Sequence, residues 1–540
     1  MRRLVRLLFL PMMALALVTG HLQAQDAGKY KNFPVPFGPT NVGRDFWFSF
    51  PANWDVPTAT QYYIRLYITS GVETRVRIYV GGAFMKQITT KPYDVVTYDF
   101  TPVQAQVFTR RDVDPVPPDQ VYKNKAIHVE ADDPIVVYGM NRTSYTSDGV
   151  LVLPTNGLGR QYVVASYAAV ADGSIQELPS QYMIVAPYDG TTISIKQTSR
   201  TESHPEGDAF TINMDRGDVW SSMTRGYNGD QTGVTIYASK PVYVVGGQNC
   251  TYIPNLITYC CCDHLCETML PVEAWGNFYH AVPFIGRRNG DFYRVFAAED
   301  NTTIYVNGAQ HAILSSRGGL EGIGWLEYRA VGRDLIEFAA DKPIYVAQYN
   351  TSQAYDGVPS DPFYLVMTPV EQYQTGVTFS TPAADFPLNY INLVCDSSAW
   401  YQMEIAQGGT ENWTKLRSYS GSTNPIKFYP SKINGLKWMG TTILVQPGTY
   451  RIRSPRPFAG YLYGFSAYDS YGYPLSVAVG NRQTPDTVAP EIVKTQNCNG
   501  TVTATTTDLP EDGTIRSNLS TIELDRAHSV NYMLTVDRVP

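Results

Sequence analysis

The sequence has few of the features that mark a chemically active protein. Of its 540 residues only seven are cysteine and seven are histidine, and the histidines do not cluster. It has no Gly-x-Ser-x-Gly motif, which would hold a serine nucleophile on a sharp turn, and no Asp-x-Asp-x-Asp-Gly calcium loop. We therefore predict no catalytic, cofactor-binding or metal-binding residues, and no cofactor.

Long apolar runs are absent after the N-terminus. Three arginines lie within the first six residues, followed by an apolar stretch at 7–18 and small residues around Ala24; this is the pattern of a secretory signal peptide. We place cleavage after Ala24, so that 1–24 is the signal peptide and 25–43 an N-terminal extension. No later run approaches the roughly 20 apolar residues of a membrane helix. We expect a secreted, extracellular or cell-surface protein without a transmembrane segment.

Excess positive charge is also missing. The formal net charge is −7, and it becomes three units more negative when the signal peptide and its arginines are removed. An acidic surface argues against nucleic acid as a partner. The 39 tyrosines, together with many valines, isoleucines and threonines, favour strands over helices.

An internal repeat organises the chain. Four prolines recur at intervals of roughly 100–115 residues, in "AIHVEADDPIVVYGMN", "GVTIYASKPVYVVGGQN", "DLIEFAADKPIYVAQYN" and "TYRIRSPRPFAGYLYGFS". We interpret each stretch as a strand, a short turn and a second strand that the proline opens. A hairpin such as "QYMIVAPYDGTTISI" precedes each stretch, and a block such as "SDGVLVLPTNGLGRQYVVASY" follows it. The prolines are Pro134, Pro241, Pro343 and Pro457.

We predict an all-β fold of four tandem antiparallel β-sandwich modules. Each repeat holds about seven short strands in about 100–115 residues, the size of a two-sheet sandwich. A four-fold β-propeller-like closure is the alternative, although a propeller blade needs only about 40–50 residues. Residues 481–540 are predicted to be a linker and a short, partial immunoglobulin-like β segment, and downstream domains could follow it. The modules are placed at 44–158, 159–274, 275–373 and 374–480.

The repeated blocks resemble the N-terminal domain of the IgGFc-binding protein family. The resemblance is carried by "FWFSFPAN", "CDHLCETMLPVEAWG", "YRVFAAEDNTTIYVNG", "ADKPIYVAQYNTS" and "DPFYLVMTPVEQY", in that order over most of 44–480. It implies a non-catalytic extracellular binding or adhesion module. Its partner is expected to be an extracellular protein or glycan ligand, such as a glycoprotein or a mucin.

Four of the seven cysteines fall in "YCCCDHLCE", residues 259–267. A zinc site typically uses two short-spaced pairs a dozen or more residues apart. A redox Cys-x-x-Cys usually opens a helix near a βαβ unit. Neither pattern is present, so we interpret the cluster as structural.

The repeat suggests which cysteines pair. An asparagine ends the proline strand and an aspartate opens the next block in three modules, and Cys250 and Cys262 adjoin these two positions in the second. If the loop closes its ends, the two could reach the Cα separation of about 5.5–6 Å that a disulfide prefers. The family resemblance supports the same pair. A second disulfide could join Cys266 to Cys260 or Cys261, and the sequence does not choose between them.

The aspartates of these blocks recur from module to module. They support an alternative function, a secreted glycoside hydrolase with paired carboxylates between modules. However, a residue found in every module more often forms a turn, so we predict that the protein is not an enzyme. They are Asp148, Asp263, Asp361 and, in the weaker fourth copy, Asp469.

Tyrosines gather in "YLYGFSAYDSYGYP" at 461–474. Aromatic side chains are common at protein interfaces and on sugar-stacking surfaces, so the stretch could supply a binding surface. We expect half or more of its tyrosines to pack on strand faces instead.

Overall fold

The computed structural model describes residues 40–54, 63–107, 118–143, 145–171, 177–255, 259, 261–315, 324–332, 334–382, 386–419, 426–430, 437–479, 491–496 and 502–507. Within these residues the fold is almost entirely antiparallel β-structure, as predicted. The predicted signal peptide and most of 25–43 and 481–540 lie outside them. None of the helices in the described ranges is long and apolar enough to cross a membrane.

Four large sheets follow one another along the chain. Sheet 1 contains β1 (Gly43–Phe48), β2 (Tyr63–Thr69), β3 (Arg75–Val80), β4 (Ala83–Thr89), β5 (Val95–Phe100), β7 (Ile127–Arg142) and β8 (Ser147–Val152). Sheet 2 contains β6 (Gln120–Tyr122), β9 (Gly159–Val163), β12 (Ser180–Val185), β13 (Thr191–Lys196), β14 (Ala209–Met214), β15 (Val219–Met223), β16 (Thr235–Thr251) and β17 (Asp263–Thr268).

The third and fourth sheets repeat the pattern. Sheet 3 contains β18 (Gly276–Ala281), β19 (Asp291–Ala297), β20 (Thr302–Val306), β21 (Ala309–Leu314), β22 (Gly324–Ala330), β23 (Ile336–Tyr349) and β24 (Tyr364–Val366). Sheet 4 contains β25 (Gln374–Ser380), β26 (Leu388–Asp396), β27 (Glu404–Gln407), β28 (Thr414–Lys415), β29 (Ile426–Pro430), β30 (Lys437–Val445), β31 (Thr449–Ser466) and β32 (Asp469–Pro474).

The remaining elements are short. Two two-stranded sheets pair β10 (Val170–Ala171) with β11 (Glu177–Leu178), and β33 (Glu491–Gln496) with β34 (Val502–Thr507). The helical turns are α1 (Pro102–Ala105), α2 (Gln353–Asp356), η1 (Thr155–Gly157), η2 (Val272–Ala274), η4 (Val370–Gln372), η5 (Trp400–Gln402) and η6 (Leu416–Ser418).

One long strand runs through each large sheet. These strands are β7, β16, β23 and β31, and they span 16, 17, 14 and 18 residues. In sheet 1, residues 127–131 of β7 pair with β3, whereas residues 136–142 pair with β2. Pro134 lies between the two segments, where a residue without an N–H interrupts the ladder least. The predicted pair of strands joined by a turn is therefore wrong, because the chain stays extended and changes partners at the proline.

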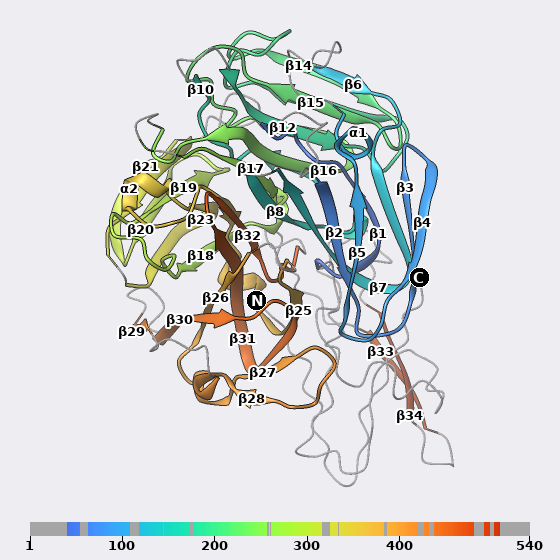
Figure 1. Cartoon of the computed structure of the whole chain (residues 1–540), viewed down its shortest axis with the longest axis vertical. Coiled ribbons are helices and arrows are strands. Elements are labelled where there is room, and N and C mark those ends of the chain that lie inside the picture. Colours follow the sequence, from blue (N-terminus) through green and yellow to red (C-terminus); the bar gives the residue numbers. More distant parts are fainter. Residues whose placement is uncertain are drawn as a thin grey trace.

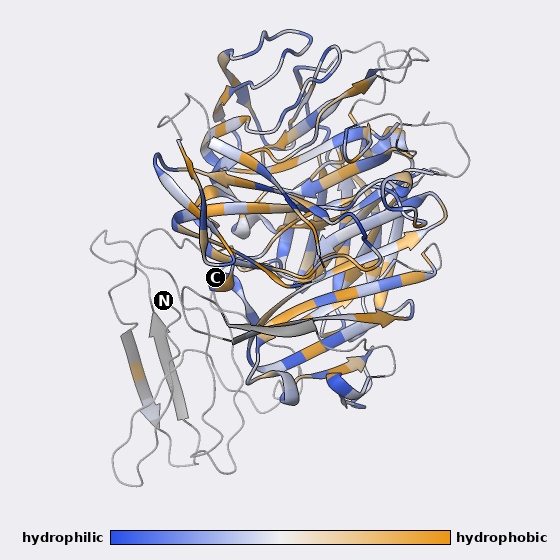
Figure 2. Cartoon of the chain, turned by 90° about the vertical axis from the view of Figure 1, so that its left-hand side faces the viewer, coloured by the Kyte–Doolittle hydropathy of each residue, from blue (hydrophilic) through white to orange (hydrophobic). Residues whose placement is uncertain are grey.

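Apolar side chains from both halves of a sheet pack into shared cores. In sheet 1, Leu66 of β2, Ile78 of β3 and Val129 of β7 are completely buried in a single cluster. The strands alternate apolar and polar residues, visible in Figure 2 as orange and blue segments along single strands. This arrangement is the sandwich-like all-β class that the sequence predicts.

The four sheets surround a common centre, where their last strands meet (Figure 1). We call β8, β17, β24 and β32 the inner strands. β8 lies against β17 and β32, and β24 lies against the same two strands, so the sheets follow one another around a ring. The approach is close, since a Cβ added at Gly472 of β32 would lie 2.3 Å from the Phe363 ring.

Contacts between the two ends of the ring close it. The Asn41 amide donates to the Val477 carbonyl (3.1 Å), and Thr40 forms a bridge with Ala478. Strand β6, which precedes β7 in the chain, pairs with β15 of the next sheet. The modules are larger than propeller blades, yet they close around an axis in the way that the propeller alternative expects.

Candidate functional site

Each inner strand follows a loop that leaves the long strand of the same sheet. We call these four loops the inner loops; they comprise residues 143–146, 252–262, 350–363 and 467–468. Ser147 donates its amide to Asp263 (2.6 Å) and its hydroxyl to the Ser470 carbonyl (2.9 Å), and the Ser470 hydroxyl donates to the Asp361 carbonyl (2.5 Å). The residues that end the loops are thus bonded to one another. The four loops must therefore emerge at the same end of the ring.

The recurring aspartates lie at this junction, and all four are buried, with at most 1% of each residue exposed. The Asp148 carboxylate accepts the backbone N–H groups of Gly149 (2.8 Å), Cys266 (3.0 Å) and Gly472 (3.2 Å). One carboxylate therefore joins strands of the first, second and fourth sheets.

Asp263 and Asp469 make similar links. The Asp263 carboxylate accepts from the amides of Ser147, His264 (2.8 Å) and Ser470 (3.2 Å). The Asp469 carboxylate accepts from the Ser147 hydroxyl and from the Arg142 guanidinium (3.0 Å). The inner strands are edges of their own sheets, so these carboxylates satisfy N–H groups that would otherwise lack partners.

Burial raises the pKa of these carboxyl groups. The pKa of Asp148 and that of Asp263 lie well above the ordinary range because both groups are removed from water, although backbone N–H donors oppose the shift. The pKa of Asp361 is raised to about 8, first by burial and then by the charge of Asp469. The acids do not face an open groove, as a catalytic pair acting on a polysaccharide would need to.

The three recurring asparagines brace the same junction. Asn141 donates its side-chain amide to the Pro51 carbonyl (2.8 Å), Asn249 to that of Ala52 (3.2 Å) and Asn350 to that of Asp361 (2.6 Å). Each is at most 2% exposed. Together with the aspartates they form a rigid base under the inner loops.

The second inner loop is closed by a disulfide. Cys250 and Cys262 are joined with a Cα separation of 5.3 Å across 12 residues. The pair is the one that the repeat suggests, and it links the end of β16 to the start of β17. Cys250 packs with Val170 and Leu178 in a small apolar cluster of its own.

The prediction that a second disulfide joins Cys266 to Cys260 or Cys261 is wrong. Cys266 is a free, buried thiol. Cys266 lies in β17, where it pairs with Gly247 of β16, and its side chain lies in the apolar core shared with sheet 1, away from the loop. Cys261 is disulfide-bonded. Its partner is none of the other cysteines that the structure describes, since Cys250 and Cys262 are joined to each other and Cys266 and Cys395 are free. Cys260 lies outside the described residues.

The second and third inner loops hold each other. The Ile253 amide donates to the Ser352 hydroxyl (3.0 Å), and the Ser352 amide donates to the Ile253 carbonyl (2.8 Å). The rings of Tyr259 and Tyr355 meet edge to face with centroids 5.0 Å apart. These contacts make one connected surface from loops of two sheets.

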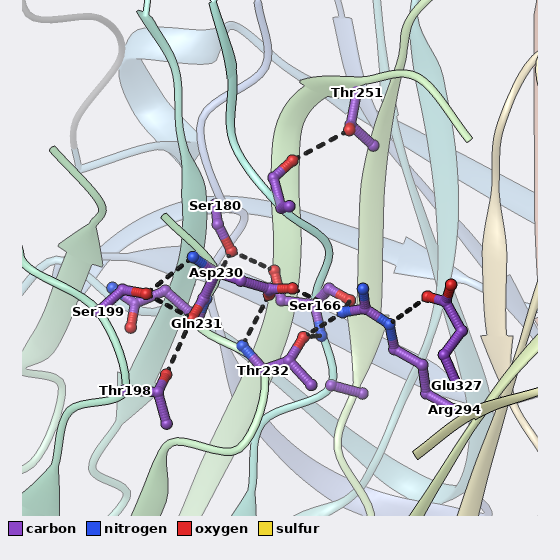
Figure 3. Close-up of polar contacts among 12 residues, drawn as sticks. Ser166, Ser180, Thr198, Ser199, Asp230, Gln231, Thr232, Thr251, Arg294 and Glu327 are labelled. Atoms are coloured by element: carbon purple, nitrogen blue, oxygen red, sulfur yellow. Dashed lines mark hydrogen bonds and ion pairs between the residues drawn. The ribbon is translucent and has the colours of Figure 1, made fainter. Parts of the chain in front are cut away.

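A buried arginine links the second and third sheets (Figure 3). Arg294 of β19 donates to the Ser166 carbonyl (2.9 Å) and to the carboxylates of Asp230 (2.9 Å) and Glu327 (3.1 Å). Its guanidinium also lies 5.6 Å from the centre of the Tyr349 ring, which precedes the third inner loop. Because its partners come from sheets 2 and 3, Arg294 fixes one sheet against the other. Sequence reasoning missed this residue, since no local motif marks an arginine buried between modules.

Exposed aromatic side chains surround the first and fourth inner loops. Tyr145 is 63% exposed, Tyr468 47% and Trp54 37%. Trp54 follows Asn53, whose side chain bonds the Thr146 carbonyl (3.1 Å) of the first inner loop. In the stretch 461–474, Tyr468 alone is exposed among five described tyrosines, and the others are buried, in line with the expected packing on strand faces. The buried ones are Tyr461, Tyr463, Tyr471 and Tyr473.

The arrangement suits recognition by a surface. Tyrosine and tryptophan supply rigid contact area, and serine, asparagine and glycine supply adaptable hydrogen bonds, which is the composition of many binding loops. In the described ranges, no group of three or more His, Cys, Asp or Glu side chains is placed to hold a metal ion.

Comparison with known proteins identifies relatives. A family model described as IgGFc binding protein matches residues 148–464. The human (Homo sapiens) IgGFc-binding protein is 22% identical over 341 residues, which cover 62% of this chain and 6% of that protein. The chain thus corresponds to a small part of its relative.

Two solved structures that align with the chain do so with low TM-scores. A GH78 family rhamnosidase of Bacillus sp. GL1 aligns with a TM-score of 0.12 and 9% identity, over 65% of this chain and 55% of that chain. An anti-sigma factor domain-containing protein aligns with a TM-score of 0.10 and 8% identity, over 58% and 83%. Neither value carries an argument about fold or function. The family model, in contrast, covers more than half of the 540 residues, and the chain belongs to the IgGFc-binding protein family.

Proposed function

We propose that this chain is a secreted or cell-surface binding and adhesion protein that is not an enzyme. Its inner loops contact a glycoprotein, a mucin or another extracellular protein. Membership of a family named for binding supports this class of function. The predicted signal peptide supports the location.

The convergence of the four inner loops at one end of the ring is the observation that carries the proposal. The ends of the loops are held by buried carboxylates, Arg294 links the second and third sheets, and the second loop is closed by a disulfide. Pre-ordered loops lose little conformational entropy on binding, which favours affinity. The exposed rings of Tyr145, Tyr468 and Trp54 provide the kind of side chain that dominates binding energy at interfaces.

Binding of the purified chain, without residues 1–24, to immobilised mucins, glycoproteins and immunoglobulin Fc tests the proposal. We expect saturable binding to at least one of them. The double variant Tyr145→Ala/Tyr468→Ala should weaken it by about tenfold or more, as loss of two interface aromatics does. Phe84→Ala is the matched control, because Phe84 is 59% exposed but lies on the outer strand β4. Equal affinity of the two variants would show that the inner loops are not the site.

A further inference from the structure

Asp361 differs from the other three recurring aspartates. It lies in the third inner loop, where its backbone carbonyl accepts from Asn350 (2.6 Å) and Ser470 (2.5 Å). Asp361 is 0% exposed, yet neither of its carboxylate oxygens has a hydrogen-bond partner among the described residues. A buried, ionised carboxylate without partners is strongly unfavourable, so this group favours its neutral form in the arrangement described.

Its surroundings are mostly acidic. Burial raises the pKa of Asp361 most, the charge of Asp469 raises it further, and the charge of Arg287 lowers it. Arg142 pairs with Asp469 (3.0 Å) and is therefore engaged elsewhere. The charged and titratable groups on the elements packed around the junction include Arg142 of β7, Asp148 of β8, Asp263, His264, Cys266 and Glu267 of β17, Arg287 before β19, Asp291 of β19, Asp356 of α2 and Asp469 of β32.

Arg287 is the cation available to form an ion pair with an ionised Asp361. It is buried, and its guanidinium donates to the Thr351 carbonyl (3.3 Å) and lies 3.6 Å from the Asp356 carboxylate. Its Nε atom has no partner in the described part of the chain. Arg287 thus holds the third inner loop through Thr351 while keeping one donor unused.

We propose that Asp361 is a proton-controlled switch for the third inner loop. When Asp361 is neutral, Arg287 stays on Thr351 and the loop keeps its contacts with Ile253. When Asp361 loses its proton, Arg287 turns towards the new charge and releases Thr351, so residues 351–356 loosen. The inference rests on the proposed function in one respect only: it makes the surface offered to a partner depend on pH.

The direction follows from the proton equilibrium. Burial raises the pKa of Asp361 to about 8, above its value in an unfolded chain. The stability that the neutral group contributes is therefore complete below the unfolded-chain pKa of about 4 and is lost progressively until the pH exceeds about 8. Within the folded chain, the proton itself leaves at about pH 8. The ordered loop belongs to the acidic and neutral range, and the loosened loop to the alkaline range.

Hydrogen exchange of the full chain, read by mass spectrometry, tests the switch without any ligand. After correction for the intrinsic rate, amides in 351–356 should exchange about tenfold faster at pH 9 than at pH 6.5, as local opening allows. Asp361→Asn keeps the group neutral and should remove the difference. Asp99→Asn, at a half-exposed side chain paired with Arg65, should leave it unchanged.

A second variant keeps the test decisive if Asp361→Asn does not fold. Arg287→Gln removes the guanidinium that holds Thr351, so amides in 351–356 should exchange at the fast rate at both pH values. A wild-type chain without the transition, or an Arg287→Gln variant that keeps the pH-dependent difference in exchange, would overturn the switch. Because no ligand is used, a chain that binds none of the tested glycoproteins can still show the switch, and the two proposals fail separately.

Discussion

At the scale of single residues, the ring depends on carboxylates that replace missing backbone partners. Asp148→Ala would leave the amides of Gly149, Cys266 and Gly472 without an acceptor in a dry junction. Each unsatisfied buried donor costs about 1–3 kcal/mol, so we expect the free energy of unfolding to fall by about 3 kcal/mol or more. Urea unfolding followed by tryptophan fluorescence measures it.

A surface acid gives the comparison. Asp99 has a side chain that is 48% exposed and pairs with Arg65 across β2 and β5. Exposed ion pairs contribute about 0–1 kcal/mol, so Asp99→Ala should change stability little. Equal losses in Asp99→Ala and Asp148→Ala would contradict the structural role of Asp148.

The repeat alone was enough to single out these aspartates, but not to find their partners. Asp148 and Asp263 stand out because the same residue returns in each module. Their acceptor role depends on N–H groups of neighbouring sheets, and no local pattern specifies how the edge of one sheet meets another. The carboxylate of Asp361, which has no hydrogen-bond partner among the described residues, and the buried Arg294 also depend on tertiary structure.

At the scale of elements, the second inner loop owes its shape to a covalent closure. The Cys250–Cys262 disulfide spans 12 residues, and closing a loop of that size contributes about 3 kcal/mol in the chain-entropy account. Cys250→Ser should lower the free energy of unfolding by about this amount, and added metal should not restore it. Denaturant melts with and without chelator measure both effects.

The double variant distinguishes the disulfide from simple packing at Cys250. If the bond is the source of stability, Cys250→Ser/Cys262→Ser should cost no more than either single change, because one bond is lost in all three. Additive losses would contradict this. Non-reducing peptide mapping of the wild-type chain should recover the two cysteine peptides joined.

The cysteine and proline patterns show where sequence reasoning stops at this scale. Loop ends marked by the repeat were sufficient to suggest the Cys250–Cys262 pair. Cys266 was misplaced because its side chain points into the core from β17, which depends on strand register. Pro134 marks a real change of pairing, but a proline in an extended strand and a proline after a turn look alike in sequence.

At the scale of the whole molecule, the four sheets share an apolar core. One apolar cluster includes Tyr138 of sheet 1, Ile236 of sheet 2, Tyr345 of sheet 3 and Leu462 of sheet 4. A sequence repeat predicts modules of similar size, but it cannot distinguish independently folded modules in a row from modules that close into a ring. Contacts between the first and last described residues of the ring, such as Asn41 with Val477, are what close it.

The shared core predicts that a single module is not stable alone. The fragment 159–274 would expose its face of the common cluster and would leave Asp263 without Ser147 and Ser470. We expect no cooperative thermal transition by circular dichroism for this fragment, whereas residues 40–479 should unfold in one transition, as a single cooperative unit does. A fragment that melts cooperatively at the temperature of the whole chain would instead establish independent domains. The same measurement would then support the predicted boundaries at 159 and 274 as limits of a self-sufficient fold.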